Sequence, residues 1–267
     1  MKKSFILLFV LLQSIVSFGL KPIKEYKMRP DSLGLKYTQD TIRTSDNFQL
    51  ISWDIQPQVD NENNKTVILF AYQDMGNMSY VLYNAMPFAK AGFHVVLFDY
   101  RGFGASQAFP INENQLFYNE YVIDFDAVLK HTKEKYKEDK VGVWSGSMGT
   151  IIATLSDKAI DFLIADSYIT NLDYVKNTIE KAKGKALIVP VSEKEYEEKI
   201  LKNAIPKIVF IGKEDKIIDR GIIEKLKNKE VVEYDGGHLQ GMWKLTEKTY
   251  GDVYVEKVQA FLKEKNI

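Results

Sequence analysis

KVGVWSGSMGTIIATL, residues 140–155, is the stretch that decides the fold. Val141 to Trp144 form an apolar, β-branched run that predicts a buried strand, and the small and apolar residues from Met148 onward have helical spacing. The glycine-rich turn between them leaves room for only a sharp connection. The stretch therefore predicts strand, tight turn and helix, with Ser147 at the apex.

The residues two before and two after Ser147 are small enough for the strand and the helix to approach each other. These are Ser145 and Gly149. A turn of this shape holds the Ser147 hydroxyl clear of the backbone at the carboxyl edge of a sheet. The helix that begins there directs the N–H of Met148 toward any negative charge that forms on a bound substrate.

Alternation of strands and helices along the chain indicates a doubly wound α/β fold with a mostly parallel sheet. An antiparallel hairpin, 37–44 with 49–55, is expected at the sheet edge. The buried strands are expected at 66–71, 94–98, 141–144, 162–165, 207–211 and 231–234. The helices are expected at 78–91, 121–136, 148–155, 221–227 and 252–265.

In a doubly wound sheet, reactive groups lie just past the carboxyl ends of the strands. Strand 207–211 leads into Asp215 and strand 231–234 leads into a glycine-flanked loop with His238. The sequence therefore predicts Ser147 as nucleophile, His238 as general base and Asp215 as its acidic partner. Three other acids, Glu214, Asp219 and Asp166, are alternatives for the acidic position.

The other two histidines are expected to be structural, because His94 opens an apolar strand and His131 lies among charged residues on a solvated helix. The sequence shows no metal-ligand constellation and no phosphate-binding loop, so we expect neither a metal nor a cofactor. The chain has no cysteine, which excludes disulfides and thiolate metal sites.

Two further segments complete a resemblance to a known family. Residues 98–106, FDYRGFGAS, resemble the D-x-R-G-x-G-x-S segment of the α/β-hydrolases, and the turn around Ser147 resembles their nucleophile elbow, with Ser145 in place of the first glycine. Gly76-Asn77-Met78-Ser79 is similar to the serine-hydrolase branch that carries H-G-N-A-G-N, the serine aminopeptidase-like esterases. The resemblance runs from about Leu33 to the C-terminus. It implies an eight-stranded sheet in one domain, 33–267, with a small cap at about 170–206.

The chain departs from that branch in the loop that should complete the oxyanion hole. Tyr72-Gln73-Asp74 stands where the branch has His-Gly-Asn. The resemblance assigns the two oxyanion N–H groups to Met148 and Asp74. A carboxylate at position 74 would oppose a developing negative charge unless the side chain turns away.

These residues predict a serine hydrolase that cleaves a small-molecule ester, thioester or amide through an acyl-enzyme on Ser147. An acyltransferase with the same triad, or a catalytically weak or inactive binding protein, are the alternatives. The chain has 36 basic and 36 acidic residues among 267, so nothing in its charge suggests nucleic acid as a partner. The sequence leaves the oligomeric state open.

The first 19 residues have the pattern of a signal peptide. Lys2 and Lys3 precede an apolar run from Phe5 to Leu12, and small residues at Ser17 and Gly19 suggest cleavage after Gly19. We therefore expect a periplasmic or secreted protein without a membrane span after cleavage. An uncleaved N-terminal membrane anchor is the alternative.

Overall fold

A computed structural model describes residues 19–267 of the chain. Its main sheet has eight strands in the order β10-β9-β8-β7-β4-β6-β3-β2. Strands β10 to β6 run parallel, and β3 and β2 are antiparallel at one edge. The strands are β2 (Tyr37–Arg43), β3 (Gln49–Ile55), β4 (Thr66–Ala71), β6 (His94–Phe98), β7 (Lys140–Gly146), β8 (Leu163–Asp166), β9 (Lys207–Gly212) and β10 (Lys229–Tyr234). The predicted doubly wound α/β fold and its edge hairpin are confirmed.

The burial of each strand explains its sequence. Every residue of β4, β8 and β9 is buried, because helices cover both faces of the central sheet, and these strands are therefore almost continuously apolar. Lys207, which opens β9, is buried too, and its Nζ donates to three backbone carbonyls. The edge strand β2 is mostly exposed.

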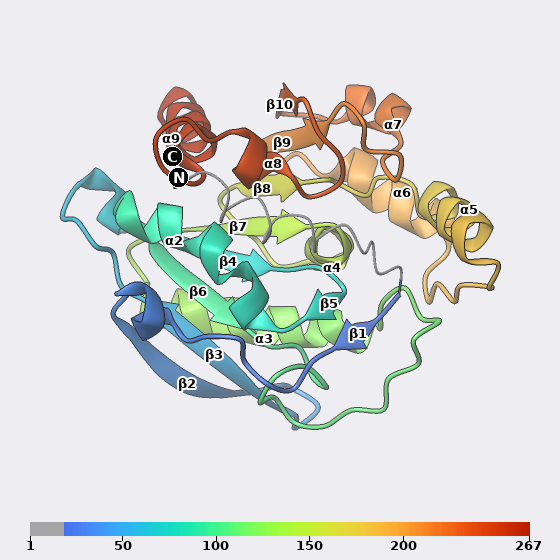
Figure 1. The fold of residues 1–267 in the computed structure, drawn as a ribbon, viewed down its shortest axis with the longest axis horizontal. Helices are drawn as coiled ribbons and strands as arrows, with labels where there is room; N and C mark the ends of the chain where they lie inside the picture. Colours follow the sequence, from blue (N-terminus) through green and yellow to red (C-terminus); the bar gives the residue numbers. More distant parts are fainter. Residues whose placement is uncertain (1–18) are drawn as a thin grey trace, which may run out of the picture.

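Helices cover the two faces of the sheet, α2 in front and α3 behind in Figure 1. Helix α2 also contacts α9, while α3 contacts α4. The helices are α2 (Leu82–Lys90), α3 (Glu120–Lys135), α4 (Met148–Leu155), α5 (Leu172–Lys183), α6 (Glu193–Lys202), α7 (Arg220–Lys225), α8 (Gly241–Lys244) and α9 (Asp252–Lys265). Short 3-10 turns are η1 (Pro30–Leu33), η2 (Glu62–Lys65) and η3 (Met78–Val81).

The helix predicted over 78–91 is interrupted. Residues 78–81 form η3 and only 82–90 are α-helical. The Asn77 side chain accepts from the N–H of Ser79, and the N–H of Met78 donates to the Asp99 carboxylate at 2.7 Å. These bonds hold the first turn in the tighter 3-10 geometry.

The segment between β8 and β9, where a small cap is expected, carries two helices, α5 and α6. Asn171 and Ser192 cap their N-termini with side-chain oxygens. Between them, the N–H of Ile188 donates to the carbonyl of Asn114 at 2.8 Å, so this segment is joined to the long loop that follows β6. In Figure 1, α5 lies at the right, beyond the arrowhead of β7.

The residues before the hairpin take part in the fold, which the sequence did not predict. Residues Lys21–Pro22 form a short strand, β1, that pairs in parallel with β5 (Met75–Gly76). Leu20 is fully buried. Because β5 follows directly on the loop with Asp74, this pairing brings the N-terminal segment to the edge of the sheet where Ser147 lies.

Gly149 is the position where α4 and β4 come closest, and its substitution tests the predicted elbow. An added Cβ would lie 1.8 Å from the carbonyl oxygen of Ala71, which belongs to the backbone and cannot rotate away. We expect Gly149→Ala to destabilise the protein by about 2 to 4 kcal/mol in chemical denaturation.

Gly221→Ala is the matched control, since a Cβ there approaches only the Asp219 carboxylate, at 3.4 Å. It should change stability by less than about 0.5 kcal/mol. Equal stability of the two variants would contradict the close approach.

Candidate active site

Ser147 connects β7 to α4 with a left-handed backbone, φ 50° and ψ −117°. Non-glycine residues rarely adopt positive φ, so this conformation is held by its surroundings. The strand pairing continues up to it, with Ser145 opposite Ala71 and Gly146 opposite Asp166. The turn is thus confined to a single residue, and β7 is longer than predicted.

His238 lies in the loop after β10 and joins the serine to an acid. Its Nε2 lies 2.8 Å from Ser147 Oγ, and its Nδ1 lies 2.8 Å from Asp215 Oδ2. The His238 side chain is 16% exposed and that of Asp215 is fully buried. In the tautomer with a proton on Nδ1, the ring donates to Asp215 and accepts the Ser147 proton on Nε2.

Asp215 is the acid that the structure brings to His238. Its Oδ1 accepts the N–H of Ile217 at 3.1 Å, and its Oδ2 accepts from Ser167 Oγ at 2.8 Å. Burial raises the pKa of Asp215, but the hydrogen bond and charge of His238, with the bonds from Ser167 and Ile217, outweigh it, and the pKa is lowered. The carboxylate is therefore ionised and able to stabilise an imidazolium.

The three alternative acids have other surroundings. Glu214 is exposed, and Asp219 caps α7 through the N–H of Gly221. Asp166 is buried at the end of β8, where Tyr234 donates to it over 3.4 Å. Burial raises the pKa of Asp166 to about 7, while the charge of His238 lowers it and that of Asp215 raises it. None of the three bonds to the His238 ring.

Met148 is the first residue of α4 and follows Ser147 directly. The N–H groups in the first turn of a helix have no acceptor within the helix. Together with the partial positive charge of the helix N-terminus, this leaves the Met148 N–H suited to binding an oxyanion next to Ser147.

The loop with Asp74 is held by the N-terminal segment. The N–H of Gly19 donates to Asp74 Oδ2 at 3.1 Å, and the N–H of Lys21 donates to the Asp74 carbonyl at 2.9 Å. Burial raises the pKa of Asp74 to about 6, against the lowering effects of the Gly19 bond and of the charges of His238 and Lys183. A carboxylate thus lies within electrostatic reach of His238.

The Asp99 carboxylate also holds this loop in place, through hydrogen bonds. It accepts hydrogen bonds from Tyr26 Oη at 2.6 Å, Tyr72 Oη at 3.1 Å and the N–H of Met78 at 2.7 Å. Tyr72, which stands in the position of the family histidine, therefore has its hydroxyl directed to Asp99. The tyrosine donors and the fully buried Asp99 join the N-terminal segment, β4 and η3 into one unit.

His94 and His131 lie away from this cluster, as predicted. His94 Nδ1 lies 3.1 Å from Tyr136 Oη, and His131 Nε2 lies 3.6 Å from the Asp40 carboxylate. Within residues 19–267, no group of three or more His, Cys, Asp or Glu side chains could hold a metal ion.

Sequence reasoning did not find Ser167, which follows β8 and bonds to Asp215. Its place just past the carboxyl end of a parallel strand is the signal that could have found it, by the rule that led to Asp215 and His238.

Comparison with known proteins agrees with this architecture. Residues 77–158 match the sequence family described as serine aminopeptidase, S33. The uncharacterised protein YfhR of Escherichia coli is 26% identical over 231 residues, which cover 81% of this chain and 77% of YfhR. The esterase Pf2001 of Pyrococcus furiosus superposes with a TM-score of 0.71 at 22% identity, over 92% of this chain and 98% of Pf2001. The chain therefore has the α/β-hydrolase fold.

A yeast relative matches a smaller part of the chain. An uncharacterised membrane protein of Saccharomyces cerevisiae, YNL320W, is 29% identical over 123 residues, which cover 45% of this chain and 40% of the yeast protein. Within residues 19–267 of this chain, none of the helices is long and apolar enough to cross a membrane.

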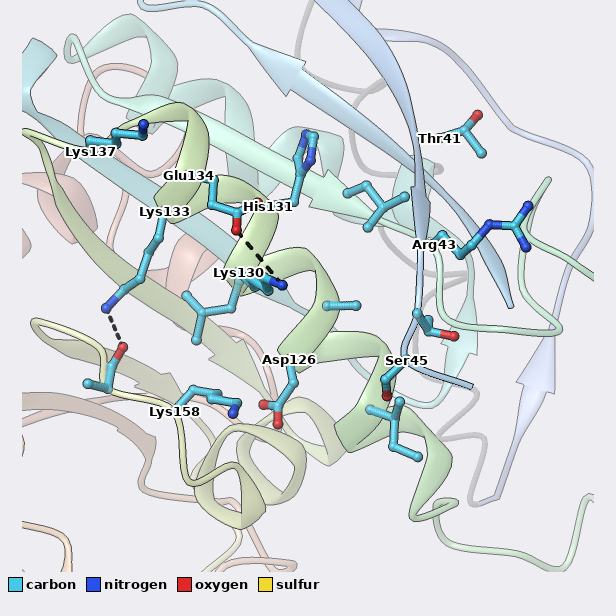
Figure 2. A pocket seen from close by; sticks show the side chains of 16 residues that line it. Thr41, Arg43, Ser45, Asp126, Lys130, His131, Lys133, Glu134, Lys137 and Lys158 are labelled. Atoms are coloured by element: carbon cyan, nitrogen blue, oxygen red, sulfur yellow. Dashed lines mark hydrogen bonds and ion pairs between the residues drawn. The ribbon is translucent and has the colours of Figure 1, made fainter. Parts of the chain in front are cut away.

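The protein also has a groove whose lining does not include the candidate triad. Figure 2 shows it between β2 and α3. Its volume is about 790 Å³. Its lining includes Lys130, Lys133, Lys137 and Lys158, and Ser147, Asp215 and His238 are not part of it. Lys130 is paired with Glu134 across 3.9 Å, and Lys133 Nζ donates to the carbonyl of Ala159. The groove is a surface feature of the hairpin edge.

The raised pKa of Asp74 predicts how its removal changes stability with pH. In the unfolded chain this carboxyl has its ordinary pKa of about 4, so between about pH 4 and 6 the folded state binds more protons and wild-type stability falls as pH rises. Asp74→Asn should therefore be more stable than wild type above pH 6, by about 1 to 3 kcal/mol, and about equal at pH 4. Urea unfolding at several pH values measures the difference.

Asp252→Asn is a control of opposite sign. Asp252 accepts backbone N–H groups of Glu247, Lys248 and Thr249, and these bonds lower its pKa. Its stabilisation is present at neutral pH and disappears in acid, so this variant should be less stable than wild type at pH 7. A stability gain for Asp74→Asn that is the same at pH 4 and pH 8 would contradict the assigned burial cost.

Proposed function

We propose that this α/β-hydrolase cleaves an ester, thioester or amide of a small molecule through an acyl-enzyme on Ser147. The observation that carries the proposal is the continuous hydrogen-bonded chain from Ser147 Oγ through His238 to Asp215, with 2.8 Å at each step, on a serine held at positive φ. The esterase Pf2001 and the serine aminopeptidase family support the same class of reaction.

In this mechanism His238 Nε2 takes the proton of Ser147 as Oγ attacks the substrate carbonyl. The tetrahedral oxyanion is stabilised by the N–H of Met148 and by an N–H of the loop at Asp74. His238 then gives its proton to the departing alcohol, thiol or amine, and the acyl group remains on Oγ. Water then attacks the acyl-enzyme while His238 takes one of its protons, and His238 returns that proton to Ser147 Oγ as the bond to the acyl group breaks and the acid is released.

The Asp74 carboxylate distinguishes a hydrolase from the main alternative, a protein that only binds its ligand. An anion near the oxyanion site opposes the transition state, and a protein that only binds its ligand would tolerate it. In a hydrolase, Asp74→Asn should turn over faster than wild type by about tenfold above pH 6, where wild-type Asp74 is ionised, and the gain should shrink in acid. A binding protein would show no turnover in either form. An acyltransferase would be revealed by acceptors that outcompete water.

A fluorophosphonate probe tests the proposal directly. The Ser147 oxygen should form a bond to phosphorus with loss of fluoride, and peptide mapping should place the adduct on Ser147. Ser147→Ala should abolish both the labelling and ester hydrolysis without lowering the melting temperature, because the Ser147 side chain is partly exposed and contributes little to packing.

Ser106→Ala is the control for this labelling, since the Ser106 hydroxyl bonds to the backbone of Asp99 and Ile51 and not to the candidate triad. It should label like wild type. An adduct on another serine, or wild-type protein that does not label, would refute the proposed mechanism.

We further infer that residues 1–19 direct export, on the sequence pattern alone, since residues 1–18 lie outside the described part of the chain. Cleavage after Gly19 would remove the N–H that donates to Asp74 and create a new α-ammonium group on Leu20, next to β1. N-terminal sequencing of protein recovered outside the cytoplasm should begin at Leu20. Intact Met1 on membrane-bound protein would instead support the anchor.

A further inference from the structure

Ser167 is a fully buried serine that the proposed mechanism does not use. It follows the last residue of β8, and its backbone has φ 55°, in the left-handed region. Its N–H donates to the carbonyl of Phe210 in β9 at 3.0 Å, which fixes the residue between two strands of the sheet. Because non-glycine residues rarely adopt this conformation, the position of the Ser167 side chain is set by the fold.

The Ser167 hydroxyl connects two parts of the candidate triad. It donates to Asp215 Oδ2 at 2.8 Å, the same oxygen that faces His238 Nδ1. It also accepts the N–H of Leu239 at 2.9 Å, the residue directly after His238. Leu239 has φ 56°, so the backbone that carries His238 is itself in an unfavourable conformation.

We propose that Ser167 is a positioning residue that holds the Asp215 carboxylate and the His238 loop in one geometry through its single hydroxyl. The inference rests on the proposed function, because it concerns how the imidazole is held for proton transfer to and from Ser147. A hydroxyl is the smallest group that can donate to the carboxylate and accept from the loop at once.

The two bonds have separate consequences. The bond to Asp215 spreads the carboxylate charge and opposes its protonation. The bond from Leu239 keeps the loop, and with it His238 Nε2, at the distance from Ser147 that proton transfer needs. Without the Ser167 hydroxyl, the Asp215 carboxylate loses a donor and is more easily protonated. The N–H of Leu239 loses its acceptor, so the loop that carries His238 relaxes.

Other ionisable groups near the triad are unchanged by this substitution. Asp166 and Tyr234 face Asp215, and Asp74 and Asp166 act on His238 through their charges. Tyr234 Oη separately accepts the N–H of Gln240 at 3.2 Å and donates to the Gly237 carbonyl at 3.1 Å, so the loop keeps a second attachment when Ser167 is altered. The loop should therefore loosen without unfolding.

Ser167→Ala tests the inference with p-nitrophenyl butyrate as the probe substrate. We expect kcat to fall about 10- to 100-fold with KM changed less than about threefold, because Ser167 is fully buried and is not exposed to a bound substrate. The acid limb of the kcat/KM profile should move to higher pH by about half a unit to one unit, since the Asp215–His238 pair then takes up a proton more readily. The fluorophosphonate labelling rate of Ser147 should fall in parallel with kcat.

Ser106→Ala is the matched control, because Ser106 is also buried and its hydroxyl likewise donates to a carbonyl, of Asp99, and accepts an N–H, of Ile51. A merely structural loss should be equal in both variants and should leave the pH profile in place. Ser167→Cys, with a similar shape and a weaker donor, should recover part of the activity.

A proton NMR measurement separates this inference from the proposed function. The Nδ1 proton of His238, hydrogen-bonded to Asp215, should give a downfield signal in wild type that shifts or broadens in Ser167→Ala and is absent in His238→Gln. A wild-type pH profile, kcat and NMR signal in Ser167→Ala would overturn the inference while labelling of Ser147 still upheld the hydrolase. Wild-type protein that is neither labelled nor active would refute the proposed function itself.

Discussion

The close approach of α4 to β4 is the constraint on which the site depends. Gly149 lets the helix lie directly against the Ala71 carbonyl, where any side chain would collide with backbone. That contact forces the chain to turn within one residue, so Ser147 takes a positive φ that its own side chain disfavours. The packing of the sheet and its helices stabilises this strained conformation. In this conformation Ser147 Oγ faces His238.

Three carboxylates around this serine, of Asp215, Asp166 and Asp74, have different environments. Asp215 receives three hydrogen bonds and has a lowered pKa, whereas Asp166 and Asp74 are dominated by burial and have raised pKa values near neutrality. Hydrogen-bond donors therefore decide which acid is ionised beside the imidazole. The hydrogen bonds from Ser167 and Ile217 therefore help to keep the Asp215 carboxylate ionised.

The N-terminal segment gives the oxyanion loop an unusual support. Gly19 and Lys21 bond to Asp74, β1 pairs with β5, and Tyr26 reaches the same Asp99 that binds Tyr72 and Met78. The departure from the family pattern at residues 72–74 is thus accommodated by new partners. Tyr72 directs its hydroxyl into the Asp99 cluster, and the Asp74 carboxylate is held by a backbone N–H.

The sequence alone is enough to predict the fold class, the elbow at Ser147 and a candidate triad of Ser147, His238 and Asp215, with Asp166, Glu214 and Asp219 left as alternative acids. These features depend on local patterns, apolar runs for the buried strands and small residues around Ser147, and on the rule that reactive groups follow parallel strands. The tertiary structure was needed to show that Asp215 and not Asp166 bonds to His238, and that the helix predicted over 78–91 begins with a 3-10 turn. It also showed that Lys21 and Tyr26 support the loop with Asp74 and that Ser167 bonds to Asp215. Those outcomes depend on hydrogen bonds between residues that are 21 to 73 positions apart. No local pattern encodes such pairings, because they exist only once the strands have aligned.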